Sequence, residues 1–276
     1  MNPNFHPELS IEFLGCSKDP VEIFYSAFQQ NCSQERASDI WMSIQNREIA
    51  YETMCQLLNK NYPEKKLTSQ IQVHFIFIIK NASSRCQSLL THQKIGLESA
   101  EMSSSMTLPA DMQTQFVTPP AFTTDSKILA QWNHLQSAMM SFYNGCLEKG
   151  ISHDDASLAL PDAHAHMFRR QVSLNFRGMQ EFLDESMCHK TYWELKEIAF
   201  QIYAHMKLEF PTLAKRLGAK CWENRNLYCD EPYDSYITCK CSHSRPHKSS
   251  LIDFFQRESC KASTDCRQKE SYYHLT

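Results

Sequence analysis

Ile71-Gln-Val-His-Phe-Ile-Phe-Ile-Ile79 carries apolar side chains at every second position. Strict alternation over this length is the pattern of a β-strand. The positions in between, from Gln72 to Ile78, become apolar toward the end of the run. A strand that is apolar on both faces suits a sheet covered on both sides. The stretch therefore predicts a buried strand at the centre of the protein.

Helical patterns precede this strand. Asp19-Pro20 is a suitable N-cap and first-turn pair, and apolar residues at helical spacing follow to Asn31. Residues 35–44 and 48–58 also carry apolar groups three and four positions apart. These segments predict a helical N-terminal region.

Further helices are predicted after the strand. Asn81 is expected to cap a short helix, and the methionine-rich residues 98–124 are expected to form an irregular loop. Ser126 opens a long helix with one apolar stripe, and Gly150 stands where a left-handed residue would end it. The expected fold class is α/β (α+β), with a central sheet flanked by helices.

Two short sequences have the spacing of a capping box, in which an acidic side chain follows a hydroxyl residue by three positions. They are Ser152-His-Asp-Asp155 and Thr191-Tyr-Trp-Glu194. The second is expected to open a helix that Pro211 ends. Between the two boxes, around residues 172–183, the spacing of apolar residues is mixed and does not predict one type of element.

Composition excludes several classes of protein. The formal charge is −3, from 28 basic and 31 acidic side chains, so we expect neither nucleic acid nor anionic lipid as a partner. The first residues lack a secretory signal, and no apolar run reaches the length of a membrane span. A cytoplasmic location is expected.

Cysteines divide the chain into two regions. Of the 12, six are dispersed among amphipathic segments, as free thiols in a reducing compartment would be. We expect residues 1–219 to form the main domain and residues 220–276 a loosely held, cysteine-rich tail. The tail could bind zinc, although its cysteine spacing is poor for a structural site and ordinary thiols are the favoured alternative. The candidate ligands are Cys221, Cys229, Cys239 and Cys241, with His243 and His247 close behind.

Several motifs occur together in a defined order. Asn175-Phe-Arg177-Gly-Met-Gln-Glu-Phe-Leu183 is followed after ten residues by Trp193-Glu-Leu195. Upstream stand Glu148-Lys-Gly-Ile151 with Ala156-Ser-Leu-Ala-Leu-Pro161, and Thr91-His92-Gln93. Their order and spacing from about Pro20 to Ala219 resemble the flavin-dependent thymidylate synthases, which carry N-x-R-S-L-x-x-F-L, W-E-I and R-H-R at these places.

The resemblance implies an FAD-dependent methylation of dUMP. Methylenetetrahydrofolate would be the carbon donor and NADPH the source of electrons. It also implies a homotetramer that binds the flavin between subunits. Asn175 and Arg177 would contact FAD, and His92 would lie beside the flavin and the nucleotide.

The chain departs from the family pattern at its arginines. Thr91 and Gln93 replace both arginines around the histidine, and Ser157 and Ser186 replace two further ones. Because charge-assisted hydrogen bonds contribute about 1.5–3 kcal/mol each, their loss would weaken binding of a phosphate-bearing ligand. Three interpretations stay open: the standard reaction, another pyrimidine nucleotide, or a non-catalytic relative kept for assembly or partner binding. Nearby cations that could substitute are Arg85, Lys94, Arg169 and Arg170.

Several weaker patterns have simpler interpretations. His153-Asp154 with His164 and His166 could indicate a metal-dependent phosphohydrolase, but the capping box already explains the first pair. Ser103-Ser-Ser105 lacks a nucleophile elbow and is expected to be a flexible loop. We expect Arg169-Arg170 to lie on a solvated face and His74 to be an ordinary sheet histidine.

Overall fold

The computed structural model describes residues 9–60, 73–91, 97–101, 115–165, 170–222, 228–239 and 245–253. Its first half contains β1 (Ser10–Cys16), α1 (Pro20–Cys32), α2 (Ala37–Gln45), α3 (Tyr51–Lys60), β2 (His74–Lys80), α4 (Ser84–Thr91), β3 (Leu97–Glu101), β4 (Gln115–Phe116) and the 3₁₀ turn η2 (Pro120–Thr124). Its second half contains α5 (Ser126–Glu148), α6 (His153–Ser157), β5 (His164–Ala165), β6 (Arg170–Asn175), α7 (Phe176–Ser186), α8 (Trp193–Glu209), α9 (Pro211–Ala214) and α10 (Tyr233–Ile237).

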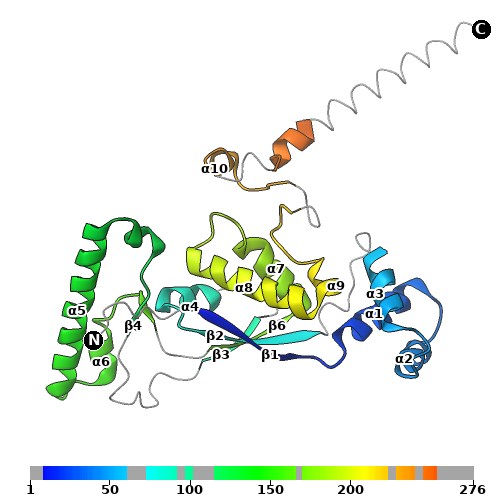
Figure 1. The fold of residues 1–276 in the computed structure, drawn as a ribbon, viewed down its shortest axis with the longest axis horizontal. Helices are drawn as coiled ribbons and strands as arrows, with labels where there is room; N and C mark the ends of the chain where they lie inside the picture. Colours follow the sequence, from blue (N-terminus) through cyan, green and yellow to red (C-terminus); the bar gives the residue numbers. More distant parts are fainter. Residues whose placement is uncertain are drawn as a thin grey trace, which may run out of the picture.

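A four-stranded sheet with the order β1-β2-β6-β3 forms the centre of the fold. All three neighbouring pairs are antiparallel. Figure 1 shows α7 and α8 together over one face of this sheet, with α1–α3 at one end of the molecule and α5 and α6 at the other. The expected class, a sheet flanked by helices, is confirmed.

The core lies between the sheet and α7 and α8. Phe75 and Phe77 of β2 are fully buried, as is Ile198 of α8. On the opposite face of the sheet Ile76 and Ile78 are only half-buried, and Leu14 is exposed. Among the described residues, the cover expected on both faces is therefore complete on one face only.

Two predicted helix caps are wrong. Asp19 precedes α1 but has a left-handed backbone (φ 50°) and makes no capping hydrogen bond with its side chain. Asn81 also has a positive φ of 61°, whereas the hydroxyl of Ser83 accepts a hydrogen bond from the N–H of Cys86 at 3.0 Å. Ser83 therefore caps α4, because it stands one residue before the helix begins.

The two capping boxes have opposite outcomes. The hydroxyl of Ser152 accepts from the N–H of Asp155 at 3.1 Å, so Ser152 is confirmed as the N-cap of α6, and the Asp155 carboxylate accepts from that hydroxyl. Before α8 the box is wrong, because α8 begins without a side-chain cap and Glu194 is completely buried. Its carboxylate instead accepts a hydrogen bond from the N–H of Ser83.

Residues 98–101 were expected to be part of a loop, but with Leu97 they form β3 (Leu97–Glu101), an outer strand of the sheet. The long helix α5 is confirmed, and Gly150 has the expected left-handed φ of 78°. The apolar stripe of α5 is largely uncovered in the single chain: Ile128, Leu135 and Phe142 are all exposed.

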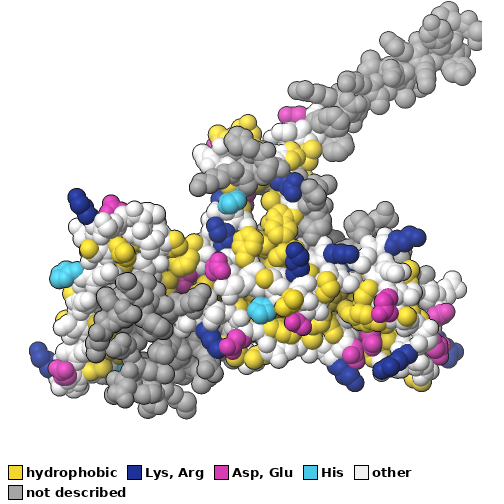
Figure 2. Space-filling view, in the orientation of Figure 1, with side chains coloured by type: hydrophobic (Ala, Val, Ile, Leu, Met, Phe, Trp, Pro, Cys, Tyr) yellow, Lys and Arg dark blue, Asp and Glu magenta, His cyan; other side chains and the backbone are white. Residues whose placement is uncertain are grey.

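Basic and acidic side chains are interspersed over the face of the molecule seen in Figure 2. No described helix is both long and apolar enough to cross a membrane.

Candidate functional site

The end of β6 brings together three parts of the chain. Asn175 is the last residue of β6 and pairs with His74, the first residue of β2. Its side-chain Oδ1 accepts a hydrogen bond from the N–H of Gly178 at 2.7 Å, so Asn175 also caps α7. The backbone N–H of His74 donates to the hydroxyl of Ser17 at 2.9 Å, which adds the chain after β1. The segments after β1, before β2 and after β6 thus meet at one end of the sheet.

Arg177 lies in the first turn of α7 at this end of the sheet. Its side chain is 54% exposed, and its Nε forms an ion pair with Glu181 at 3.0 Å. His74 is exposed as well, so the expected ordinary sheet histidine lies at an accessible strand end. The site therefore presents a guanidinium, an amide and an imidazole to ligands.

Helix α1 also begins near this end of the sheet. Phe24 of α1 and Phe176, the first residue of α7, pack with ring centroids 4.8 Å apart. The contact places the N-terminal part of α1 beside the start of α7. Helix N-termini favour anions, because they carry unpaired N–H groups and the positive end of the helix dipole. The first turns of α1 and α7 therefore lie near the same end of the sheet.

His92 lies outside the described residues, but both flanking elements are described. Thr91 is the last residue of α4, and Leu97 begins β3. Leu97 is paired with Leu174, the residue immediately before Asn175. The chain that follows His92 therefore enters the sheet beside the strand that carries Asn175.

Two buried charged side chains hold α4 in place. Arg170 is 2% exposed and donates from its terminal nitrogen to the carbonyl of Gln87 at 2.8 Å. Glu194 of α8 accepts from the N–H of Ser83 at 2.9 Å and from the Ser83 hydroxyl. Arg170 was expected on a solvated face, so that expectation is wrong. Sequence analysis also missed the anchoring role of Glu194, although its position beside Leu195 on the apolar side of α8 was a usable signal.

Of the other cations considered as substitutes, only Arg85 lies among the described residues, and it makes its contacts elsewhere. Arg85 lies over the ring of Tyr192, 5.6 Å from its centroid, and approaches Asp162 at 3.9 Å. Lys94 and Arg169 lie outside the described residues. Ser186, which replaces a family arginine, is 1% exposed, so this position is enclosed in the single chain.

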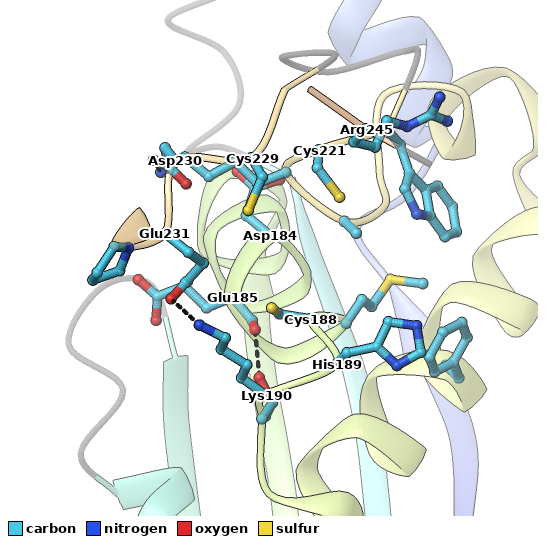
Figure 3. A pocket seen from close by; sticks show the side chains of 17 residues that line it. Asp184, Glu185, Cys188, His189, Lys190, Cys221, Cys229, Asp230, Glu231 and Arg245 are labelled. Carbon is cyan, nitrogen blue, oxygen red and sulfur yellow. Dashed lines mark hydrogen bonds and ion pairs between the residues drawn. The ribbon is translucent and has the colours of Figure 1, made fainter. Parts of the chain in front are cut away.

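A second feature is a cavity of about 740 Å³ between the α7–α8 connection and the C-terminal segment. Three cysteines from separate segments line it: Cys188, Cys221 and Cys229. Figure 3 shows Cys221 and Cys229 entering from the segment on one side, with Cys188 on the other. Two ion pairs join residues that line the cavity, one between Lys190 and Glu231 and one between Lys220 and Asp230.

Burial raises the pKa of the Cys188 thiol, and the nearby Glu231, Cys239 and Cys229 raise it further. Burial likewise raises the pKa of Cys221, with added contributions from Cys229 and Cys188. A raised pKa favours the protonated thiol, whereas reactive catalytic cysteines have a lowered pKa. The sequence placed Cys221 and Cys229 in the tail and Cys188 among the dispersed thiols, and the structure shows all three lining one cavity.

Among the described residues, the remaining metal candidates are not brought together. Cys239 does not line the cavity, and Cys241 lies outside the described residues. His153 is exposed on α6, and His164 is buried against Phe116. In the parts of the chain that the structure describes, no three His, Cys, Asp or Glu side chains are already set as metal ligands. His166 and the serines 103–105 lie outside those parts.

Comparison with known proteins covers most of the chain. A family profile described as "Thymidylate synthase complementing protein" matches residues 13–212. The flavin-dependent thymidylate synthase of Nitratidesulfovibrio vulgaris is 26% identical over 234 residues, which is 81% of this chain and 92% of that protein. The flavin-dependent thymidylate synthase of Pyrococcus horikoshii is 25% identical over 162 residues, or 57% of this chain and 65% of that protein.

A solved structure has the same fold. The UMP/dUMP methylase PolB from Streptomyces cacaoi, bound with 5-Br dUMP, superposes with a TM-score of 0.57. The match covers 75% of this chain and 93% of that one, at 13% sequence identity.

Proposed function

Because the chain belongs to the thymidylate synthase complementing protein family, we propose that it is a flavin-dependent methyltransferase acting on the uracil ring of a pyrimidine nucleotide. The proposed reaction is the reductive methylation of dUMP to dTMP or of the related UMP. FAD would be the cofactor, with methylenetetrahydrofolate and NADPH as co-substrates. The names of the sequence relatives and of the structural neighbour support this reaction class.

The proposed binding site lies at the end of β6. Asn175 and Arg177 would hold FAD, and His92 would lie beside the flavin and the nucleotide. The observation that carries this assignment is the pairing of Leu97 with Leu174. It brings the strand that follows His92 next to the strand that ends in Asn175. The described strand after one motif therefore lies beside the described strand that begins the other, which supports a shared site.

The residues present fit a phosphate-bearing cofactor. FAD would supply the redox chemistry, while the protein supplies binding and orientation. Arg177 uses Nε for Glu181, which leaves its terminal nitrogens for two parallel hydrogen bonds to phosphate. Asn175 uses Oδ1 for its cap, so its Nδ2 can donate to a ligand carbonyl.

We also propose that the protein is a cytoplasmic homo-oligomer, a tetramer by family resemblance. Helix α5 supports an assembly, because its 23 residues contain just two side chains charged at neutral pH, Lys127 and Glu148. A helix that stays in water normally carries many more. The eight cysteines whose side chains the structure describes are free, which suits a reducing compartment.

A second candidate function is a non-catalytic relative retained for assembly or partner binding. The observation that favours it is the replacement of the family arginines at Thr91, Gln93 and Ser186, the last of them in an enclosed position. Such a protein would keep the fold without tight nucleotide binding.

The visible absorption spectrum of the purified full chain separates the two candidates. A flavin spectrum, obtained directly or after incubation with FAD, supports the methyltransferase, and a protein that cannot bind FAD supports the non-catalytic relative. Complementation of a thymidine-requiring bacterium then tests the substrate. Growth supports dUMP, whereas soluble flavoprotein without growth excludes the standard reaction and directs the search to UMP.

A further inference from the structure

Two cysteines of the cavity stand beside an ion pair that joins two stretches of the chain. Lys220 is paired with Asp230, which brings the residues next to them along the chain close to one another. Cys221 follows Lys220, and Cys229 precedes Asp230. Figure 3 shows both cysteine side chains entering the same cavity from these neighbouring stretches, with Cys188 on the other side. The thiols of Cys221 and Cys229 therefore face one space.

Cys229 is fixed to the C-terminal segment. Its backbone N–H donates to the carbonyl of Pro246 at 2.8 Å, and its carbonyl accepts from the N–H of Lys248 at 2.9 Å. In the described parts of this segment, residues 228–239 and 245–253, the buried side chains are Cys229 and His247. A bond to Cys229 would therefore hold the segment at one of its two buried positions.

Cys221 is fixed to the helices that cover the sheet. The backbone N–H of Lys220 donates to the carbonyl of Asp184 of α7 at 3.4 Å. On the other side of Cys221, the ring of Trp222 packs edge-on against Tyr203 of α8, with the ring centroids 5.3 Å apart. The two cysteines thus belong to different parts of the fold that meet at the cavity.

We propose that Cys221 and Cys229 are a redox-sensitive pair, whose intramolecular disulfide attaches the C-terminal segment to α7 and α8. The structure described here is the reduced form, in which both thiols are free. Disulfides of proteins in reducing compartments are commonly transient and redox-sensing. The proposal is independent of the proposed methyltransferase function, because the cavity lies apart from Asn175 and Arg177.

The oxidant is a small disulfide such as oxidised glutathione, to which the cavity of about 740 Å³ gives access. The thiolate of one cysteine attacks this disulfide, forms a mixed disulfide and expels one small thiolate. The thiolate of the second cysteine then attacks the protein sulfur of the mixed disulfide and expels the other small thiolate. The two protein thiols lose two electrons to the oxidant, and their two protons pass to the two small thiols released.

The C-terminal segment has a physical need for such a bond. A unit with so little apolar burial gains little from the hydrophobic effect, and small units of this kind are commonly stapled by disulfides. The ion pairs Lys190–Glu231 and Lys220–Asp230 are partly exposed and add little. A disulfide restricts the unfolded chain, so the oxidised protein should be the more stable form.

The test treats the reduced full chain with limiting oxidised glutathione and maps the disulfides by mass spectrometry after alkylation. Because burial raises the pKa of the Cys221 thiol, the reaction is run in mildly alkaline solution. The first disulfide should join Cys221 to Cys229, with loss of the mass of two hydrogen atoms and a rise of a few degrees in melting temperature. Dithiothreitol should reverse these changes.

Variants separate this pair from the other thiols. Cys221→Ser and Cys229→Ser should each abolish the rise in melting temperature, whereas Cys188→Ser and the control Cys146→Ser on α5 should behave as the parent does. The mapping itself uses the wild-type chain, so it needs no variant to fold.

The chain unfolded in guanidinium is the control for pairing by closeness in sequence, and it should give a mixture of disulfides. The same mixture from the folded chain would overturn the proposal. So would a first disulfide that contains Cys188, or oxidation that stops at mixed disulfides with glutathione.

Discussion

The carboxylate of Glu194 accepts a hydrogen bond from the backbone N–H of Ser83 at 2.9 Å, across 111 residues of sequence. It also accepts from the hydroxyls of Ser83 and Tyr192. Since Ser83 caps α4, the first turn of α8 fixes the start of the helix that leads to His92. This contact connects the core of the fold to the proposed site.

Glu194→Ala should destabilise the protein by about 2–4 kcal/mol, because it leaves several buried donors without their acceptor. Denaturant unfolding measures the change. Glu197→Ala is the matched control, since Glu197 is exposed on the same helix, and it should change stability by less than about 0.5 kcal/mol. Equal effects of the two substitutions would contradict the anchoring role of Glu194.

The protein should lose stability in alkaline solution because of the half-buried phenol of Tyr192. Burial and its hydrogen bond to Glu194 raise the pKa of the Tyr192 phenol from 10.0 to about 12. The unfolded chain therefore loses this proton at a lower pH than the folded protein. The stabilising contribution is complete below about pH 10 and disappears as the pH rises toward about 12.

Melting temperatures recorded across that interval test this expectation. Relative to the parent, Tyr192→Phe should show a shallower decline between about pH 10 and about pH 12. Tyr233→Phe, at an exposed tyrosine, should follow the parent curve. Parallel curves for Tyr192→Phe and the parent would show that Tyr192 is not perturbed.

Gly218 and Gly145 should respond in opposite ways to alanine. Gly218 has a φ of 135°, and an added Cβ would lie 2.4 Å from the Trp222 ring. Gly218→Ala should therefore destabilise the protein by about 1–3 kcal/mol. Gly145 lies within α5 with open space around it, so Gly145→Ala should stabilise by about 0.5–1 kcal/mol. Chemical denaturation of both variants gives the comparison, and a neutral Gly218→Ala would contradict the conformation described.

The exposed stripe of α5 should control assembly. Phe142 is 63% exposed in the single chain, and a charge there would be buried in any oligomer that covers the stripe. Phe142→Glu should therefore shift the protein toward monomer in light scattering after size exclusion. Asn144→Glu, at an exposed polar position on the same helix, should leave the mass unchanged. An unchanged mass for Phe142→Glu would exclude α5 from the contact.

Local patterns predicted the elements that depend on local chemistry. The alternation in β2 and the apolar stripe of α5 reflect periodicities of 2 and 3.6 residues, and both elements are present. β3 could not be predicted in the same way, because Leu97–Glu101 contains a single large apolar residue. Its strand conformation comes from pairing with β6, which is a contact with a distant segment.

Tertiary contacts also explain the missed side chains. Glu194 has the spacing of a capping box, but Ser83 and Tyr192 provide buried donors that compete successfully for its carboxylate. Asn175 and Arg177 could be selected from their motif because both are local to the β6–α7 turn. The partnership of Cys188 with Cys221 and Cys229 depends on how α7 meets the tail, which no spacing within the sequence records.

The most direct measurement of the central claim is a titration of the purified protein with FAD, comparing the parent with Arg177→Ala and Glu181→Ala. The Arg177–Glu181 pair is exposed, so both substitutions should change stability by less than about 1 kcal/mol. Arg177→Ala should weaken FAD binding by at least about tenfold, the loss of one charge-assisted contact. Glu181→Ala, which frees the guanidinium, should bind FAD at least as tightly as the parent. Equal affinity of the parent and Arg177→Ala, or a parent that binds no FAD, would contradict a flavin site at the β6–α7 junction.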